Sequence, residues 1–267
     1  ARIREGIWYY VSTDDYGPSR IVFRQGSYDQ DIMSRTLEIA GGYVGRTPLL
    51  DGRIFVDIGA NIGTSTIPAL KVFGAARAVS IEPAVENYKL LRCNLIANEI
   101  EDRVHALRAA VSDQQGSGTF EWAEGDWGDH RVRVGTGLPD GPSHESDRST
   151  VAVPLKRFDD LVTEIPIELP RVGIVWMDVQ GHEGHVLAGA ASLRSSDVPV
   201  AIEYWPYGLR RADGLHLLHE LIAADYRTVV DVRASMAGAP AELPAADVAS
   251  LADRYGEQNY TDLLLLK

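Results

Sequence analysis

Apolar and polar residues alternate along the chain with two different periods, and the period predicts the local structure. Near-continuous apolar runs are typical of strands that are buried on both faces of a parallel sheet. Such runs cover residues 53–58, 77–82, 104–111, 173–178, 198–203, 226–232 and 261–266. Stretches with amphipathic helical spacing lie between them, over residues 64–73, 84–98, 183–193 and 214–224. This alternation predicts an α/β fold with a doubly wound sheet.

Two regions depart from the alternation. Residues 1–50 contain short apolar runs over 7–11 and 20–23 that predict strands, and a helical pattern over 31–40. Residues 114–150 are rich in Gly, Asp, Ser and Pro, which predicts an irregular insertion near the substrate. We expect a single domain over residues 1–267, with an N-terminal cap over 1–50, a Rossmann-like core over 51–113 and 151–267, and the insertion over 114–150.

Composition and charge narrow the classes of function. The 267 residues carry a formal net charge of −12, and such an acidic surface repels phosphate backbones, so we expect no nucleic-acid partner. No stretch approaches the ~18 uncharged apolar residues of a membrane span, and the first residues lack the apolar segment of a signal peptide. We therefore expect a cytoplasmic location and no membrane partner. A homo-oligomer remains open.

The sharpest motif lies at the turn after the run over 53–58, where Asp57 precedes Gly59, Ala60, Asn61 and Gly63. Glycines at a strand-to-helix turn let the backbone pass close to a ligand. The Gly-x-Gly-x-x-Gly spacing of dinucleotide sites is absent, and Asp57 would repel a pyrophosphate but attract an ammonium group. S-adenosylmethionine has an amino-acid end and a sulfonium but no phosphate, so the motif favours this cofactor over NAD.

Two further acids follow predicted strands. Glu82 ends the run over 77–82, where a carboxylate can accept hydrogen bonds from both ribose hydroxyls. Asp178 ends the run over 173–178, and ligands of open α/β sheets bind outside these carboxyl ends. We expect Asp57, Glu82 and Asp178 to converge on one crevice that holds a nucleoside. The alternative is a set of capping acids in an ordinary α/β protein.

Taken in order, these motifs resemble the FkbM-type methyltransferases, which are class I S-adenosylmethionine-dependent enzymes. The resemblance covers residues 50–205 and is carried by 55–63, by Glu82-Pro83, by 110–113 and by 177–190. It implies a seven-stranded Rossmann-like fold and methyl transfer to a hydroxyl of a small-molecule acceptor, a sugar or a secondary metabolite. The family more often has Lys and Glu where this chain has Trp176 and Gln180.

By position, the resemblance also implies where the cofactor lies. The loop over 57–63 would line its amino-acid end, Glu82 would hold the ribose, and Ala110 and Val111 would border the adenine. The implied cofactor-binding residues are Tyr28, Asp29, Asp57, Gly59, Ala60, Asn61, Gly63, Thr64, Glu82, Pro83, Ala110, Val111 and Asp178. S-adenosylhomocysteine would be the product.

Methyl transfer to an alcohol needs a group that takes the proton, which is general-base work. The candidates are Asp178, His182 at the lip of the crevice, and His130 in the insertion. A bound Mg²⁺ could acidify the hydroxyl instead, held by Asp178, Glu203 and His182.

Aromatic residues near the same edge predict an acceptor pocket. Trp127 lies in the insertion, and Glu203, Trp205 and Tyr207 follow the run over 198–203. Alternatives stay open: methyl transfer to nitrogen or to a macromolecule, a non-catalytic S-adenosylmethionine-binding module, or a nicotinamide-dependent oxidoreductase. The arginine- and alanine-rich composition favours a bacterial source, where such enzymes act in natural product biosynthesis.

Overall fold

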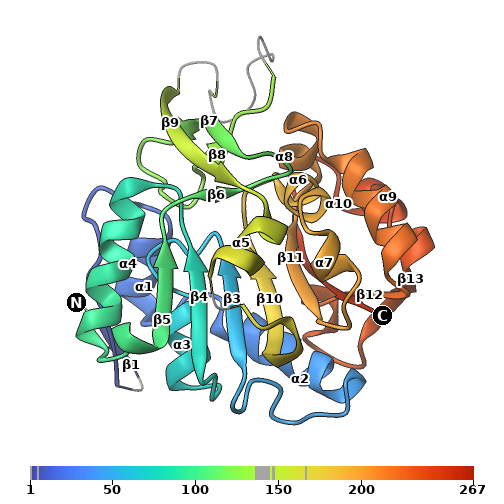
Figure 1. Cartoon of the computed structure of the whole chain (residues 1–267), viewed down its shortest axis with the longest axis horizontal. Coiled ribbons are helices and arrows are strands. Elements are labelled where there is room, and N and C mark those ends of the chain that lie inside the picture. Colours follow the sequence, from blue (N-terminus) through green and yellow to red (C-terminus); the bar gives the residue numbers. More distant parts are fainter. Residues whose placement is uncertain (1, 5, 136–144, 146–147, 166) are drawn as a thin grey trace.

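The computed structural model describes every residue except 1, 5, 136–144, 146–147 and 166. In the described part, eight strands form one mixed sheet in the order β13-β12-β14-β11-β10-β3-β4-β5 (Figure 1). The strands are β3 (Ile54–Ile58), β4 (Arg77–Ile81), β5 (Val104–Leu107), β10 (Val172–Met177), β11 (Val200–Tyr204), β12 (Thr228–Asp231), β13 (Ala241–Pro244) and β14 (Thr261–Leu266). The strands from β11 to β5 are parallel to one another, whereas β14, β12 and β13 pair antiparallel. The predicted α/β fold class is confirmed, and β13 makes the sheet one strand wider than expected.

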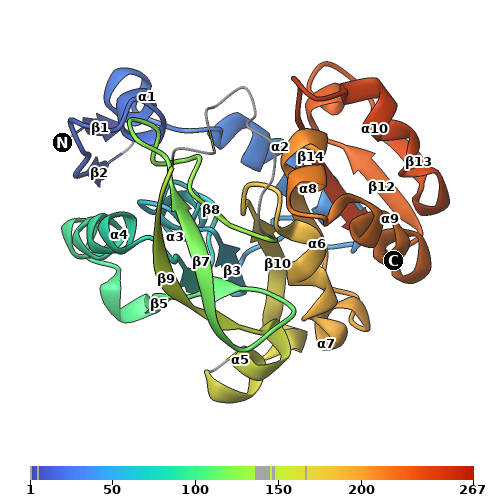
Figure 2. The same cartoon turned by 90° about the horizontal axis from the view of Figure 1, so that it is seen from above.

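Helices cover both faces of this sheet (Figure 2). The helices are α1 (Pro18–Gln25), α2 (Gln30–Tyr43), α3 (Thr66–Lys71), α4 (Val85–Ala97), α5 (Phe158–Glu164), α6 (Glu183–Ala188), α7 (Ala191–Arg194), α8 (Pro206–Arg211), α9 (Leu215–Asp225) and α10 (Ser250–Tyr255), with single 3₁₀ turns η1 (Glu101–Arg103), η3 (Leu169–Arg171), η4 (Arg233–Ser235) and η5 (Ala245–Asp247). Successive side chains of a strand point to opposite faces. Val56 therefore packs in the cluster with α5, α6 and α9, while Phe55 packs in the cluster with α2, α3 and α4. Among the described residues, no helix combines the length and apolarity that a bilayer span needs.

A second sheet lies over the carboxyl edge of the first (Figure 1). It consists of β6 (Ala110–Val111), β7 (Gly116–Trp122), β8 (Arg131–Val132) and β9 (Ser149–Lys156), in the order β6-β9-β7-β8. The expectation of an irregular insertion over 114–150 is therefore wrong for β7 and β8, and the strand predicted over 104–111 is divided between β5 of the first sheet and β6 of the second. Only Phe120 and Glu121 of β7 and Val153 and Leu155 of β9 are buried, so the sequence lacks the apolar run of a buried strand.

The N-terminal segment also differs from its prediction. The short strand β2 (Ile7–Tyr9) pairs antiparallel with β1 (Arg2–Arg4), but residues 20–23 belong to helix α1 rather than to a strand. Pro18 occupies the first turn, where its missing N–H is harmless, and Gly26 ends the helix with φ 78°. The helix buries Val22 and leaves Phe23 exposed, which is the spacing of a surface helix and not of a buried strand.

Two asparagines of α4 hold this segment on the core. Asn98 accepts from the Trp8 amide at 2.9 Å and donates to the Trp8 carbonyl at 2.7 Å. Asn94 makes the same pair with Tyr10 and also donates to the Ile62 carbonyl at 2.9 Å. Side-chain amides four residues apart thus pair with the edge of β2 as another strand would, and they tie the N-terminal segment to the loop after β3.

Candidate functional site

A cavity of about 440 Å³ lies at the carboxyl ends of β3, β4, β10 and β11, a size within the range of small-molecule sites. Its two ends differ in chemistry. The Glu82 end is lined by Glu82, Pro83, Ala110, Phe120 and His130. The Glu203 end is lined by Asp29, Asp178, Glu203, Arg233 and Asp262.

The structure brings most of the predicted site residues to this cavity. Those that line it are Tyr28, Asp29, Gly59, Asn61, Thr64, Glu82, Pro83, Ala110, Val111, Trp127, His130, Asp178, His182, Glu203 and Trp205. Asp57, Ala60, Gly63 and Tyr207 are not among the lining residues. For these four, a direct contact with a ligand stays a prediction.

Asp57 is buried directly behind the wall of the cavity. Its Oδ2 accepts a hydrogen bond from Thr66 Oγ1 at 2.5 Å, and Thr66 Oγ1 lies 2.7 Å from Ser80 Oγ. Burial raises the pKa of Asp57 to about 7, although the Thr66 hydrogen bond opposes the rise. The Oδ1 atom is buried and has no partner among the described residues.

That loop is shaped by close backbone contacts. A Cβ on Gly59 would lie 1.8 Å from the Asp178 carbonyl oxygen, and Gly59 has φ 89°, so only glycine fits. The next turn places Asn61 at φ 47°, and its amide donates to Glu82 Oε2 at 2.9 Å. Glu82 Oε1 accepts from the Ala84 amide at 2.8 Å. Two backbone amides therefore hold the Glu82 carboxylate in one orientation at the mouth of its strand.

The loop between β7 and β8 forms the roof of the Glu82 end. The Trp127 carbonyl accepts from Asn61 Nδ2 at 3.2 Å and from Asn87 Nδ2 at 3.0 Å. The Trp127 amide donates to Asp15 Oδ1 at 3.0 Å. Trp127, predicted to contact the acceptor, is thus anchored over the Glu82 end. Asn87, which the sequence analysis missed, lies in the first turn of α4 and lines the cavity.

Both predicted histidines are buried and neutral. Burial lowers the pKa of His182 to about 3 and the pKa of His130 to about 4. His182 stacks on His185 with ring centroids 4.5 Å apart, and His130 stacks on Trp122 at 4.1 Å. Rings fixed in this way with such low pKa values are poor acceptors for an alcohol proton near pH 7.

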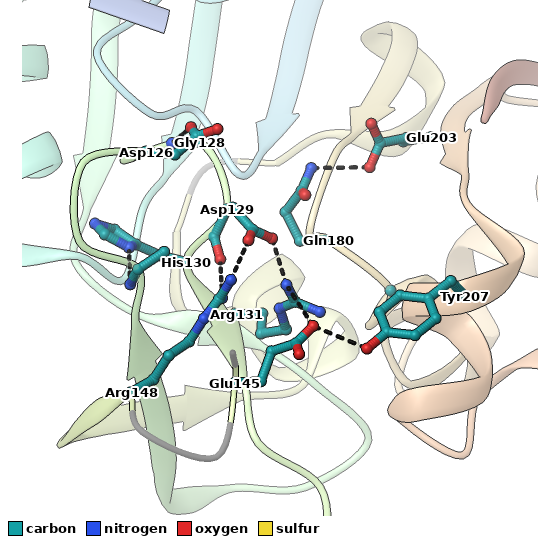
Figure 3. Close-up of polar contacts among 12 residues, drawn as sticks. Asp126, Gly128, Asp129, His130, Arg131, Glu145, Arg148, Gln180, Glu203 and Tyr207 are labelled. Atoms are coloured by element: carbon teal, nitrogen blue, oxygen red, sulfur yellow. Dashed lines mark hydrogen bonds and ion pairs between the residues drawn. The ribbon is translucent and has the colours of Figure 1, made fainter. Parts of the chain in front are cut away.

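At the other end, one amide group joins two carboxyl groups. Gln180 Nε2 donates to Asp178 Oδ1 at 2.7 Å. It also donates to Glu203 Oε2 at 2.8 Å (Figure 3). Gln180 has φ 55°, a left-handed conformation that turns its side chain back towards the strand ends. Burial raises the pKa of both acids, and Asp178 raises that of Glu203 further. Each of the two acids is therefore easier to protonate than the same group in water.

Glu183 fixes the loop that carries this pair. Its Oε1 accepts from the amides of Val179 and Gly181 at 3.0 and 3.3 Å. Burial raises the pKa of Glu183 to about 8, so the side chain is largely protonated at neutral pH. A Cβ on Gly181, which has φ 98°, would lie 2.3 Å from the Gly208 carbonyl carbon.

At the same end, an arginine links two further acids, a contact that the sequence analysis did not predict. Arg233 Nη2 donates to Asp29 Oδ2 at 2.6 Å, and Arg233 Nε lies 2.6 Å from Asp262 Oδ2. The guanidinium also lies 4.7 Å from the centre of the Tyr260 ring. The signal for Asp262 was present, since an acid inside an otherwise apolar terminal strand needs a buried partner. Asp29 and Arg233, more than two hundred residues apart, meet only through the fold.

The aromatic residues after β11 contact residues of the insertion. The Arg131 guanidinium lies 5.1 Å from the centre of the Trp205 ring, and Trp205 packs 5.2 Å from Tyr207. Tyr207 donates to Glu145 Oε1 at 2.9 Å (Figure 3). Trp205 thus presents its remaining surface to the cavity, whereas Tyr207 ties α8 to the insertion.

The residues do not form the magnesium site that the sequence allowed. His182 Nε2 is 3.0 Å from Ser112 Oγ, and the Gln180 amide lies between Asp178 and Glu203. Within the described residues, no group of three or more His, Cys, Asp or Glu side chains is arranged to hold a metal ion.

Comparisons with known proteins agree with this architecture. The model of the methyltransferase FkbM domain matches residues 57–228. The 2-O-methyltransferase NoeI of Sinorhizobium fredii strain NGR234 is 26% identical over 157 residues, which are 57% of this chain and 63% of that relative. The chain therefore spans less than two thirds of the length of that relative.

Two solved structures are similar in shape at low identity. The methyltransferase FkbM from Methylobacillus flagellatus has a TM-score of 0.47 at 17% identity, with 94% of this chain and 61% of that chain covered. An O-methyltransferase from Bacillus cereus in complex with SAH has a TM-score of 0.45 at 12% identity, with 93% and 96% covered. Both scores lie below 0.5, so the assignment rests on the domain match. That match covers most of the chain and contains Asp57, Glu82 and Asp178, and the chain belongs to the FkbM methyltransferase family.

Proposed function

We propose that the protein transfers a methyl group from S-adenosylmethionine to a hydroxyl of a small-molecule acceptor, a sugar or a secondary metabolite. The observation that carries the proposal is that one cavity joins a clamped Glu82 carboxylate to the Asp178–Glu203 pair. The family assignment and the name of the 2-O-methyltransferase relative support the reaction type.

In this proposal the Glu82 end binds the nucleoside. Glu82, held by the Asn61 and Ala84 amides, accepts from the ribose hydroxyls. The roof at Trp127 excludes water from this end. The loop after β3, with Gly59, Asn61 and Thr64 on the cavity wall, lines the methionine portion.

The Glu203 end performs the proton chemistry. S-adenosylmethionine supplies a methyl group on a positively charged sulfur, and the acceptor oxygen forms the new C–O bond as the C–S bond breaks. We propose that Asp178 takes the hydroxyl proton, with Gln180 orienting its carboxylate and Glu203 sharing the negative charge. Because the Gln180 amide already bridges the two acids, we propose that no Mg²⁺ takes part.

The first test is binding and turnover in one preparation. Calorimetry should show binding of S-adenosylhomocysteine and no binding of NAD. Radiolabelled S-adenosylmethionine, incubated with a panel of glycosides and hydroxylated metabolites, should then transfer its methyl group to at least one acceptor, with the methylated oxygen identified by NMR.

Each outcome of this test decides between the alternatives. Binding of S-adenosylhomocysteine with methyl transfer to oxygen supports the proposal. Transfer to nitrogen or to a macromolecule overturns the acceptor class. Cofactor binding without turnover on any acceptor class favours a non-catalytic module, and binding of NAD alone overturns the methyltransferase assignment.

A further inference from the structure

The N-terminal cap supplies part of the cavity wall, although it lies outside the matched family domain. The domain match begins at residue 57. Six residues that line the cavity nevertheless come from the cap: Gly17, Pro18, Ile21, Tyr28, Asp29 and Met33. In Figure 2 the loop after β7, which forms the roof of the Glu82 end, lies beside α1 of the cap. The contact between these two segments therefore bears on how the cavity is covered.

One buried acid binds both sides of this contact. Asp15 is 1% exposed. Its Oδ2 accepts from the Ser19 amide at 2.7 Å, and its Oδ1 accepts from the Gly17 amide at 2.9 Å, both at the start of α1. The same Oδ1 accepts from the Trp127 amide of the roof at 3.0 Å. Because a buried carboxylate is stable only among donors, Asp15 holds the start of α1 and the roof together.

The two segments also pack closely against each other. A Cβ on Gly17 would lie 2.1 Å from Asp126 Oδ1, and a Cβ on Gly128 would lie 3.0 Å from Pro18 Cγ. The proline ring is stiff, so a methyl group on Gly128 must push the roof away from the cap. All four residues line the cavity, so a change in their packing changes the cavity wall.

The roof connects this contact to the acid of the Glu82 end. The Trp127 carbonyl accepts from the side-chain amides of Asn61 and Asn87. The main-chain amide of Asn61 donates to Glu82 Oε2. Trp127 is thus held on both sides, through its amide by the cap and through its carbonyl by the residues below it. Asp15 can therefore influence a ligand at Glu82 without touching that ligand.

We propose that Asp15 is a positioning residue that keeps the roof closed over the bound cofactor. The inference rests on the proposed function, because it takes the ligand of the Glu82 end to be S-adenosylmethionine. The bound ligand leaves only after the roof separates from the cap, so weakening this contact acts on the dissociation rate. Affinity differences between variants of one binding site are mostly differences in this rate.

Asp15→Asn tests the proposal with little change in shape. A side-chain amide has only one acceptor oxygen, so it can serve either α1 or the roof, and its NH₂ group then faces an amide donor on the other side. S-adenosylhomocysteine should dissociate about tenfold faster, as expected for the loss of a hydrogen bond to a charged group. The association rate should stay within about twofold of wild type. Surface plasmon resonance on immobilised protein measures both rates.

Asp159→Asn is the matched control for a merely structural role. Asp159 accepts from the Ala191 and Ser192 amides, each at 2.9 Å, at the start of α7. It is not among the residues that line the cavity. Both variants should lower the melting temperature, because each removes an acceptor from the start of a helix. Only Asp15→Asn should change the dissociation rate.

Gly128→Ala tests the same contact from the roof and leaves Asp15 and its partners unchanged. The added methyl group meets Pro18 and should hold the roof away from the cap, which should speed dissociation of S-adenosylhomocysteine about fivefold. Gly42→Ala is its control within the cap, because a Cβ there meets nothing within 4 Å.

The outcomes are distinct. Faster dissociation in Asp15→Asn and Gly128→Ala, with wild-type rates in both controls, supports the inference. A wild-type dissociation rate in either of these two variants, with the fold intact by circular dichroism, overturns it, as does an equal acceleration in Asp159→Asn. If Asp15→Asn does not fold, the rate in Gly128→Ala decides alone. If wild-type protein does not bind S-adenosylhomocysteine, the proposed function itself fails.

Discussion

The two ends of the cavity hold their polar groups by different means. At the Glu82 end, two main-chain amides donate to the Glu82 carboxylate and hold it in place. The two histidines, His130 and His182, are uncharged. At the Glu203 end, side chains hold side chains, with Gln180 between Asp178 and Glu203 and Arg233 between Asp29 and Asp262.

This difference suits the Glu82 end to rigid ligand binding and the Glu203 end to proton transfer. Backbone amides cannot change their charge and move little, so the Glu82 end is preorganised for a ligand of fixed shape. Burial also raises the pKa of Glu82, to about 7, but two backbone amides there favour the anion. The Glu203 end instead brings several acids together, whose pKa values are raised by burial and by one another, the environment in which a proton can be exchanged. Binding and chemistry are thus expected to respond to different mutations.

The largest effect should come from Asp178→Asn, which removes the proposed base and preserves shape. We expect turnover to fall by ~100-fold or more, because general-base catalysis contributes factors of this size. The measurement is methyl transfer at saturating cofactor. A variant with more than a tenth of wild-type turnover would show that another group takes the proton.

Gln180→Glu should convert the Glu203 end into a cation site. Three carboxylates would then meet where the amide bridges two, and oxygen-rich clusters of this kind bind divalent ions. We expect Mn²⁺ binding with a Kd of roughly 0.1–1 mM by electron paramagnetic resonance, and none in wild-type protein. Gln180→Ala removes the bridge without adding a charge and should bind no Mn²⁺. Tight Mn²⁺ binding by wild-type protein would contradict metal-free transfer.

Asn87→Ala tests the roof of the Glu82 end. The Trp127 carbonyl would keep only its hydrogen bond from Asn61, so the roof should open more often. Losing one such hydrogen bond costs about 1 kcal/mol, or roughly fivefold in the affinity for S-adenosylhomocysteine. The control is Asn259→Ala, in which an exposed side-chain amide loses its hydrogen bond to the Tyr255 carbonyl. Equal effects of the two variants would show that Trp127 does not close on the ligand.

Glu183→Gln tests the buried acid behind the catalytic loop. Its folded pKa is raised to about 8, so between about pH 5 and 8 the folded state keeps a proton that the unfolded state has lost. Wild-type stability should therefore decline relative to Glu183→Gln as pH rises through this window. The slope is about 1 kcal/mol per pH unit, measured by urea unfolding. A difference that is constant with pH would mean that Glu183 is ionised in the native protein.

The Glu82 end could be predicted because its residues come from contiguous motifs. Asp57, Glu82 and Ala110 each follow a buried apolar run, and the carboxyl ends of parallel strands meet at one edge. The positions of these three residues in the site therefore follow from the strand order alone. The fold class could be predicted from the sequence for the same reason.

The Glu203 end and the second sheet could not be read in this way. Arg233 and Asp29 meet only after β12 and α2 pack against the same edge, so no local pattern marks them as partners. The strand β7 contains Gly116 and Gly118 and buries only Phe120 and Glu121, so it lacks the apolar alternation of a strand. Residues 20–23 form a helix because Pro18 and Gly26 set its ends, which outweighs their apolar strand-like composition.

The most direct test of the division between the two ends is one set of calorimetric titrations with S-adenosylhomocysteine. Glu82→Ala should weaken binding by roughly 30- to 100-fold, since it removes charge-assisted hydrogen bonds to the ribose. Glu86→Ala changes a half-exposed acid in the first turn of α4 that pairs with Lys89, and it should leave binding unchanged. Glu203→Gln should stay within about threefold of wild type. Unchanged affinity in Glu82→Ala, or a loss in Glu203→Gln as large as that in Glu82→Ala, would contradict the account.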